Sequence, residues 1–176
     1  MKIGHSTIVL LGLFVAHCVH AQSPQTSSSP TSKPEFSIHV MPPPAPFKLG
    51  EPVVVEVIIT NIAKHEIFWA TWFSMSKDLP YLSCHFLLER NGKEVETTYF
   101  DRYITGRVKP DDPFKVLSGS SILLPKPPGK MFDMNIDLTR LYQITKPGTY
   151  TLHVSRYDPA TKTTVSANPA TIQITR

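Results

Sequence analysis

The pairing of a thiol with an imidazole, at Cys84 and His85, is the first place where this sequence could do chemistry. A cysteine nucleophile needs a base within hydrogen-bond reach of its sulfur. The surrounding alternation predicts a strand, and neighbouring side chains on a strand point to opposite faces. Cys84 shares its predicted face with Phe86 and Leu88, so we interpret it as a small buried core residue rather than a nucleophile.

Histidines could bind zinc, and four of them follow the predicted export signal described below. Zinc ligands commonly occur in pairs roughly two to five residues apart, and none of the four has such a partner. Two strands could still bring His39 and His153 together, because both lie opposite the apolar residues of their strands. We adopt the ordinary interpretation that they face solvent, and we expect no metal and no cofactor. The four are His39, His65, His85 and His153.

Three oxygen-bearing side chains, Asp133, Asn135 and Asp137, alternate in the manner of the start of a calcium loop. The rest of that motif is missing, since Leu138 stands where the loop needs glycine and Ile144 where it needs a bidentate glutamate. We therefore predict a plain strand with three polar side chains facing water.

Nucleophilic and acid–base chemistry find no better support elsewhere. The sequence has no G-x-S-x-G nucleophile elbow, and its near miss at Gly119-Ser120-Ser121 lies in a strand-and-turn context. The adjacent carboxylates Asp111 and Asp112 lie between two prolines, which is typical of a solvated turn. We predict that the protein is not an enzyme and has no catalytic residue.

The beginning of the chain predicts export. Residues 1–21 combine a basic start, a short apolar run and a small-residue exit, which is typical of a cleaved secretory signal. The run is too short to cross a bilayer, so we expect no transmembrane segment and a location in the periplasm or outside the cell. A lipobox-like pattern ends at Cys18, but His17 occupies the position of a small residue. Secretion is therefore favoured, and a lipid anchor at Cys18 stays the alternative.

Composition divides the remainder into two parts. Residues 22–34 are rich in Ser, Thr, Gln and Pro and predict a disordered tether, whereas 35–176 suit one domain. Removing the signal takes away one lysine, so the formal net charge becomes 4 − 1 = +3. Lysines and arginines are scattered without a nucleic-acid-binding motif, which argues against a nucleic-acid partner.

The elements of this domain read as strands. Residues 53–61 alternate most strongly, and Asn91-Gly92 favours a tight hairpin turn. We predict an all-β, antiparallel immunoglobulin-like sandwich of about eight or nine strands with one helical turn at 138–142. No internal disulfide can form, because Cys84 is the only thiol after residue 21. Predicted strands are 36–41, 53–61, 67–73, 84–90, 93–100, 122–124 paired with 131–136, 149–156 and 168–175, with Trp69 or Trp72, Phe86 and Tyr150 in the core.

Four stretches, 53–61, 86–95, 125–129 and 147–150, together resemble bacterial immunoglobulin-like domains of the BsuPI proteinase-inhibitor type. The resemblance implies a non-enzymatic domain and includes protease inhibition among its functions. This chain differs from the family's namesake in its export signal, and no inhibitory residue can be matched position by position.

We therefore expect an exported, non-catalytic sandwich that binds a protein or cell-surface ligand. The contact region that we predict is a long loop at 101–115, with Tyr103, Arg107 and Phe114 as residue types enriched in interfaces. The ordinary alternative is a loop with one buried aromatic residue.

Two other functions stay open. A protease inhibitor would insert residues 105–110 as a substrate-like strand, with Arg107 as its specificity residue. A structural or assembly module of the cell envelope would pack through an uncovered apolar strand face such as Val54 and Ile58.

Overall fold

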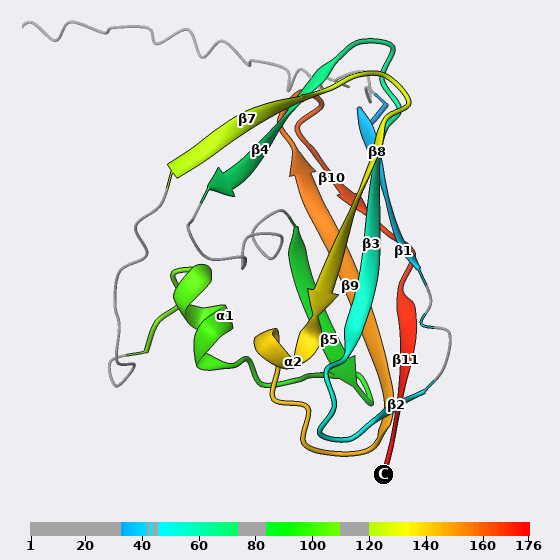
Figure 1. Ribbon diagram of the computed structural model, residues 1–176, viewed down its shortest axis with the longest axis vertical. Coiled ribbons are helices and arrows are strands. Elements are labelled where there is room, and N and C mark those ends of the chain that lie inside the picture. The colour runs from blue at the N-terminus through cyan, green and yellow to red at the C-terminus, as the bar shows by residue number, and fades with distance from the viewer. Residues whose placement is uncertain (1–32, 42, 44–45, 74–83, 110–119) are drawn as a thin grey trace, which may run out of the picture. The chain divides into compact units, whose positions relative to one another are not determined.

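The structure, a computed structural model, describes residues 33–41, 43, 46–73, 84–109 and 120–176 (Figure 1). The predicted signal and lipid-anchor position, most of the predicted tether, and Phe114 lie outside these residues. In this part of the chain, no helix is long and apolar enough to span a bilayer. The elements are β1 (Phe36–Met41), β2 (Phe47–Lys48), β3 (Val54–Asn61), β4 (Ile67–Phe73), β5 (His85–Arg90), β6 (Lys93–Glu94), α1 (Tyr99–Ile104), β7 (Ser120–Lys126), β8 (Met131–Asp137), α2 (Leu138–Leu141), β9 (Gly148–Asp158), β10 (Thr163–Ser166) and β11 (Ala170–Thr175).

Two sheets form the body of the domain. One has the order β1-β3-β8, and the other has the order β2-β11-β9-β5-β6 with β10 also paired to β9. Every pairing within them is antiparallel except that of β2 with β11. One sheet thus contains β1, β3 and β8, and the other contains β5, β9 and β11. This division of the strands between two sheets is the arrangement of an immunoglobulin-like sandwich. The predicted fold class is confirmed.

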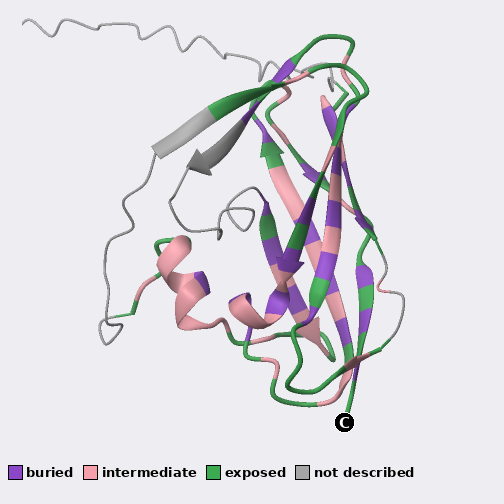
Figure 2. Cartoon of the chain, in the orientation of Figure 1, coloured by how far each residue is buried: buried purple, intermediate pink, exposed green. Residues whose placement is uncertain are grey.

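Buried residues alternate with more exposed ones along the strands of both sheets (Figure 2), and their apolar side chains form the core. Val55, Val57 and Ile59 of β3 are at most 2% exposed, as are Leu152 and Val154 of β9. Burying one such side chain contributes about 1.5–3 kcal/mol, so the periodicity of two gives each strand its inner face. The described cysteine, Cys84, is free, so apolar packing holds the sheets together without a disulfide.

Tyr150 fixes the start of β9. Its ring is 2% exposed, and its hydroxyl donates a 2.5 Å hydrogen bond to the backbone carbonyl of Lys146, four residues upstream. A tyrosine that bonds back to the preceding turn at this strand is the tyrosine corner of immunoglobulin-like sandwiches. Trp69 and Phe86 are also buried, as predicted, whereas the Trp72 side chain lies outside the described part.

The predicted hairpin between 122–124 and 131–136 is wrong. β7 pairs with β4, and β8 pairs with β3. The two pairs are successive parts of one two-stranded ribbon, which bends between them. Asn61 lies at the bend, where its side-chain nitrogen donates to the carbonyls of His65 (3.0 Å) and Lys126 (2.7 Å). Because this amide joins the two turns at the bend, β7 continues along β4 instead of folding back on β8.

The predicted long loop at 101–115 is wrong for 101–104, which are helical, whereas 105–109 are turn and irregular chain as predicted. Residues 99–104 form α1, and the predicted return strand at 93–100 shrinks to the two residues of β6. Thr98 caps the helix, since its hydroxyl accepts a 3.2 Å hydrogen bond from the Asp101 N–H. The predicted helical turn at 138–142 is confirmed as α2, with Asp137 accepting from the Thr139 N–H at 3.0 Å.

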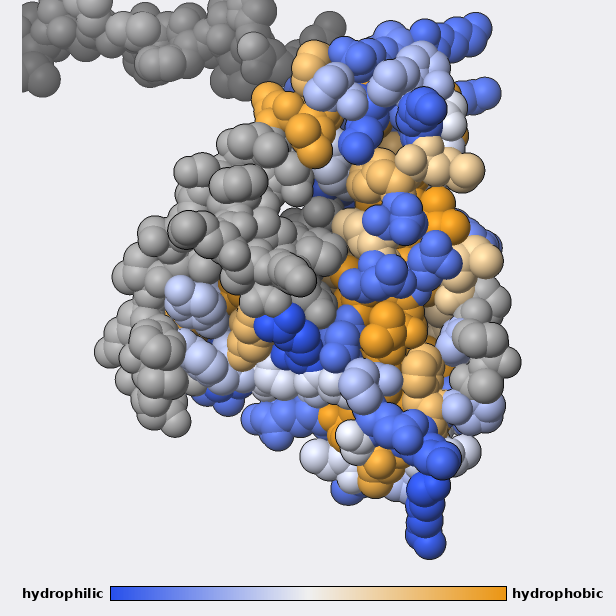
Figure 3. Space-filling model, viewed as in Figure 1, coloured by the Kyte–Doolittle hydropathy of each residue, from blue (hydrophilic) through white to orange (hydrophobic). Residues whose placement is uncertain are grey.

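One end of the sandwich exposes large apolar side chains. This end contains the start of β1 and the turns β3–β4, β7–β8 and β9–β10, and it lies at the top of Figure 1. In the space-filling view, hydrophobic atoms lie next to hydrophilic ones there (Figure 3). Among the most exposed residues are Phe68 (64%), Leu123 (63%) and Met131 (68%).

Candidate functional site

The predicted contact residues lie on α1 and on the turn that follows it. Asp101 is only 5% exposed, and the Arg107 guanidinium bonds to its carboxylate at 2.7 Å while its own side chain stays 51% exposed. A second bond runs from Arg107 Nε to the Thr105 hydroxyl at 3.1 Å. Burial raises the pKa of Asp101, and the neighbouring Arg107 charge opposes that rise. The pair therefore holds an exposed cation in one place.

Tyr103 lies in the last turn of α1, close in the chain to Arg107. Its carbonyl accepts the Gly106 N–H at 3.3 Å, so the turn that carries Arg107 folds back onto the helix. The Tyr103 ring is half-buried and lies 5.9 Å from the Tyr99 ring. The structure thus brings two of the three predicted residues to one surface, and the third, Phe114, lies outside the described part.

α1 is itself attached to α2. The Thr98 N–H donates to the Leu141 carbonyl at 2.8 Å, and the Thr98 hydroxyl bonds to the Arg140 carbonyl. The Arg140 guanidinium also lies over the Phe100 ring, 4.3 Å from its centroid. Because α2 continues directly from β8, these contacts tie the Tyr103–Arg107 surface to the sandwich.

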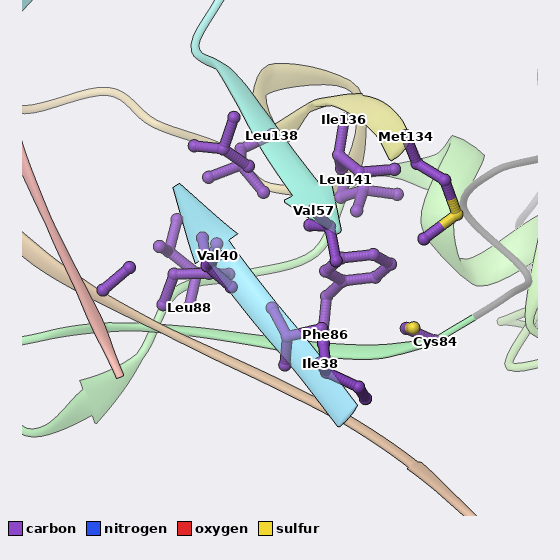
Figure 4. Packing of buried hydrophobic residues seen from close by; sticks show 14 of the residues in the cluster. Ile38, Val40, Val57, Cys84, Phe86, Leu88, Met134, Ile136, Leu138 and Leu141 are labelled. Carbon is purple, nitrogen blue, oxygen red and sulfur yellow. The ribbon is translucent and has the colours of Figure 1, made fainter. Parts of the chain in front are cut away.

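Cys84 is a core residue, as interpreted from the sequence. It is 9% exposed and lies beside Phe86 in the apolar interior (Figure 4). Burial raises the pKa of its thiol to about 12, although the Arg156 charge opposes this. His85, on the next position, is exposed, so the two side chains lie on opposite faces of β5. The thiol is neither ionised at neutral pH nor close to a base on its own strand.

His39 and His153 are not brought together. His39 is exposed on β1 of one sheet, whereas His153 lies on the outer face of β9 in the other, where it contacts Glu89 at 3.4 Å. Within the described ranges, no three His, Cys, Asp or Glu side chains cluster so that they could hold a metal ion.

The alternating polar residues of β8 face outward, opposite β3. Asp133 and Asn135 are exposed, and their strand partners are Ile58 and Glu56. Asp137 uses its carboxylate to cap α2, accepting from both the backbone N–H and the hydroxyl of Thr139. That capping role accounts for the third member of the predicted pattern.

Two open hollows at the opposite end of the sandwich escaped sequence reasoning. Their volumes are about 460 and 360 Å³, and both are lined by Gln143 and Thr145. Arg90 lines the larger one, where its Nη2 donates to the Pro147 carbonyl at 2.9 Å and its buried Nε has no partner. The sequence signals near them, the Asn91-Gly92 turn and the 147–150 stretch, indicate turns and strands and not a hollow. Their walls mix both signs of charge, so they indicate no particular ligand.

Comparison with known proteins does not identify a family for this chain. No protein-family model and no curated protein matches the chain. A solved structure similar to this chain is the CARDB domain of a Pyrococcus furiosus protein, determined by solution NMR. The two chains are 10% identical with a TM-score of 0.40, and the match covers 80% of this chain and 94% of that one. The fold assignment therefore rests on the strand order and the Tyr150 corner.

Proposed function

We propose that this protein is an exported, non-catalytic β-sandwich that binds a protein ligand of the cell surface through the surface of α1 and residues 105–109. The observation that carries the proposal is the 2.7 Å pair between Arg107 and buried Asp101, on a helix attached to the sandwich. Arginine and tyrosine are enriched where interfaces gain most of their binding energy. A side chain that is already held in place loses less entropy on binding, which favours this surface.

Export is the second part of the proposal. It rests on the signal-like residues 1–21 and the tether-like residues 22–34, which would present the folded unit in the periplasm or outside the cell. Cleavage after residue 21 is expected, and lipidation of Cys18 is the alternative. Mass spectrometry of the N-terminus recovered from expressing cells distinguishes them, because lipidation adds acyl mass to Cys18.

The binding experiment is an affinity capture from the envelope of the source organism, with the exported protein as bait. Changing Tyr103 and Arg107 to Ala should remove specific captured proteins. A matched variant changes Leu49 and Lys146, which are exposed and lie outside α1 and residues 105–109, to Ala and should capture as the parent does. Thermal unfolding must show that each variant is folded. Equal capture by all three proteins contradicts the assignment.

Protease inhibition is the alternative that the BsuPI-type resemblance favours. Residues 105–107 and 109 are exposed, which an inhibitory segment needs. Arg107 would have to release Asp101 in order to enter a specificity pocket, so it suits better as the residue that holds the segment in place. The test is inhibition of a panel of serine, cysteine and metalloproteases at micromolar concentration. Absence of inhibition across the panel excludes this function.

An assembly role is supported by one exposed apolar residue of the outer face of β3. Val54 is 42% exposed, while Ile58 on the same face is half-buried. Packing through this face predicts self-association that rises with concentration and falls in Val54→Ser. A strictly monomeric species in light scattering contradicts it.

A further inference from the structure

Large exposed apolar residues are concentrated at one end of the sandwich, away from the proposed binding surface. Nine such residues are exposed in the described part of the chain, and six of them lie at the end that contains the β3–β4, β7–β8 and β9–β10 turns. The six are Ile62 (54%), Phe68 (64%), Leu123 (63%), Leu124 (39%), Met131 (68%) and Tyr157 (56%). We call this the apolar end.

Hydrogen bonds and strand register place these residues near one another. Glu35 lies at the start of the folded unit. Its carbonyl accepts hydrogen bonds from the N–H groups of Ile62 (2.9 Å) and Ala63 (3.1 Å). Its own N–H donates at 3.0 Å to Asp158, the neighbour of Tyr157. On the ribbon, Phe68 is opposite Pro125 and Ala70 is opposite Leu123. Phe68 and Leu123 therefore share one face as diagonal neighbours.

Lysines surround the apolar residues. Five lysines and Arg156 lie at this end or within two residues of it, against four carboxylates, Glu35, Glu66, Asp133 and Asp158, which leaves 6 − 4 = +2. Asp158 is 1% exposed and accepts bonds inside the fold, and Glu35 contacts His65 at 3.0 Å. Four of the five lysines are exposed, against two exposed carboxylates, Glu66 and Asp133, so positive charge predominates on the surface offered to a partner. The five lysines are Lys33, Lys64, Lys126, Lys130 and Lys162.

We propose that the apolar end docks on a membrane surface of anionic lipids, with Phe68 and Leu123 entering the headgroup boundary and the lysines contacting lipid phosphates. Side chains of both kinds on one surface are the pattern of interfacial membrane binding. Lysine stems can cover apolar surface while their ammonium groups reach outward, and Lys126 already lies 4.8 Å from the centroid of the Phe132 ring.

A second copy of this chain is a poorer fit for the same surface. In a two-fold dimer the same patch meets itself, so the lysine excess of one copy would face that of the other. Anionic phosphates neutralise those charges instead. The folded unit also begins at this end, at Glu35, so the predicted tether would be attached on the membrane-facing side.

The test is flotation of the exported protein with vesicles of phosphatidylcholine, with and without phosphatidylglycerol. Binding is expected only where phosphatidylglycerol is present, and it should weaken as salt rises. Phe68→Ser with Leu123→Ser should weaken it about tenfold or more, since apolar burial is lost. Lys130→Gln and Lys162→Gln should each weaken it about fivefold.

A matched control changes Leu49 and Val54, which are exposed away from the apolar end, to Ser and should bind as the parent does. All variants carry the same N-terminus, so any contribution from residues before Glu35 is constant among them. No flotation, or equal flotation by every variant, overturns the proposal. So does a dimer in light scattering that Phe68→Ser dissolves, since a second copy would then cover this face. If the parent binds no vesicles and the Phe68→Ser, Leu123→Ser variant loses a captured protein, the apolar end binds a protein partner, and the membrane proposal is overturned.

Discussion

The Tyr142 hydroxyl donates a 2.7 Å hydrogen bond to the backbone carbonyl of Phe86, across 56 positions of the sequence and inside the core. Tyr142 ends α2, which follows β8 of one sheet, and Phe86 belongs to β5 of the other. The bond therefore links the two sheets. Burial raises the pKa of Tyr142, which keeps its hydroxyl protonated and able to donate at all ordinary pH values.

Tyr142→Phe should destabilise the protein by about 1–2 kcal/mol, because it leaves the buried Phe86 carbonyl without its donor. Urea unfolding followed by fluorescence measures the change. Tyr157→Phe is the control, since its side chain is 56% exposed, and it should change stability by less than about 0.5 kcal/mol. Equal effects of the two variants would show that the bond contributes nothing.

Asn61→Ala should cost more, about 2–4 kcal/mol, because one amide serves the carbonyls of both His65 and Lys126. Asn61 is 1% exposed, so water cannot replace it without opening the bend. Hydrogen exchange should show increased opening of β4 and β7 in particular. Asn135→Ala, at an exposed position of β8, provides the control and should leave exchange there unchanged.

Asp101 should give stability a pH dependence of definite sign. Because its pKa is raised in the folded state, the folded protein holds a proton that the unfolded chain has released. Stability should therefore fall as pH rises from 3.8, the ordinary pKa of an aspartate side chain, through the raised native pKa. Asp101→Asn should remove this decline from unfolding curves measured across that window.

Asp133→Asn, which removes a carboxylate from an exposed position of β8, is the matched control. Arg107→Gln should steepen the decline, because Asp101 then loses the charge that favours its ionised form. A profile unaltered in Asp101→Asn would contradict burial of this carboxylate.

Cys84 should resist alkylation until the protein unfolds. With a pKa raised to about 12 and only 9% exposure, the native thiol offers almost no thiolate to iodoacetamide near neutral pH. Mass spectrometry should find slow labelling of Cys84 in buffer and rapid labelling in urea. Labelling in buffer as fast as in urea would mean that the β5 end of the core opens freely.

Most of the strands could be predicted because their signal is local. In β3, Val55, Val57 and Ile59 alternate with polar residues, and the alternation itself chooses the buried face. The Asp137 cap of α2 also lies beside the residues that it serves. α1 was missed because its single capping threonine is a weak signal, and its buried Asp101 depends on Arg107 and on contacts with α2.

The residues alone determined which faces are apolar, that no disulfide could close the domain, and that Cys84 belongs to the core. Tertiary structure decided which strands pair, since β7 pairs with β4. The Asn61 amide at the bend reaches its acceptor, the Lys126 carbonyl, across 65 positions of the sequence. Tertiary structure also decided that Arg107 meets Asp101 and that apolar and lysine side chains from three separate turns share one end. Periodicity is a property of neighbours, whereas these relationships depend on distances that only the folded chain sets.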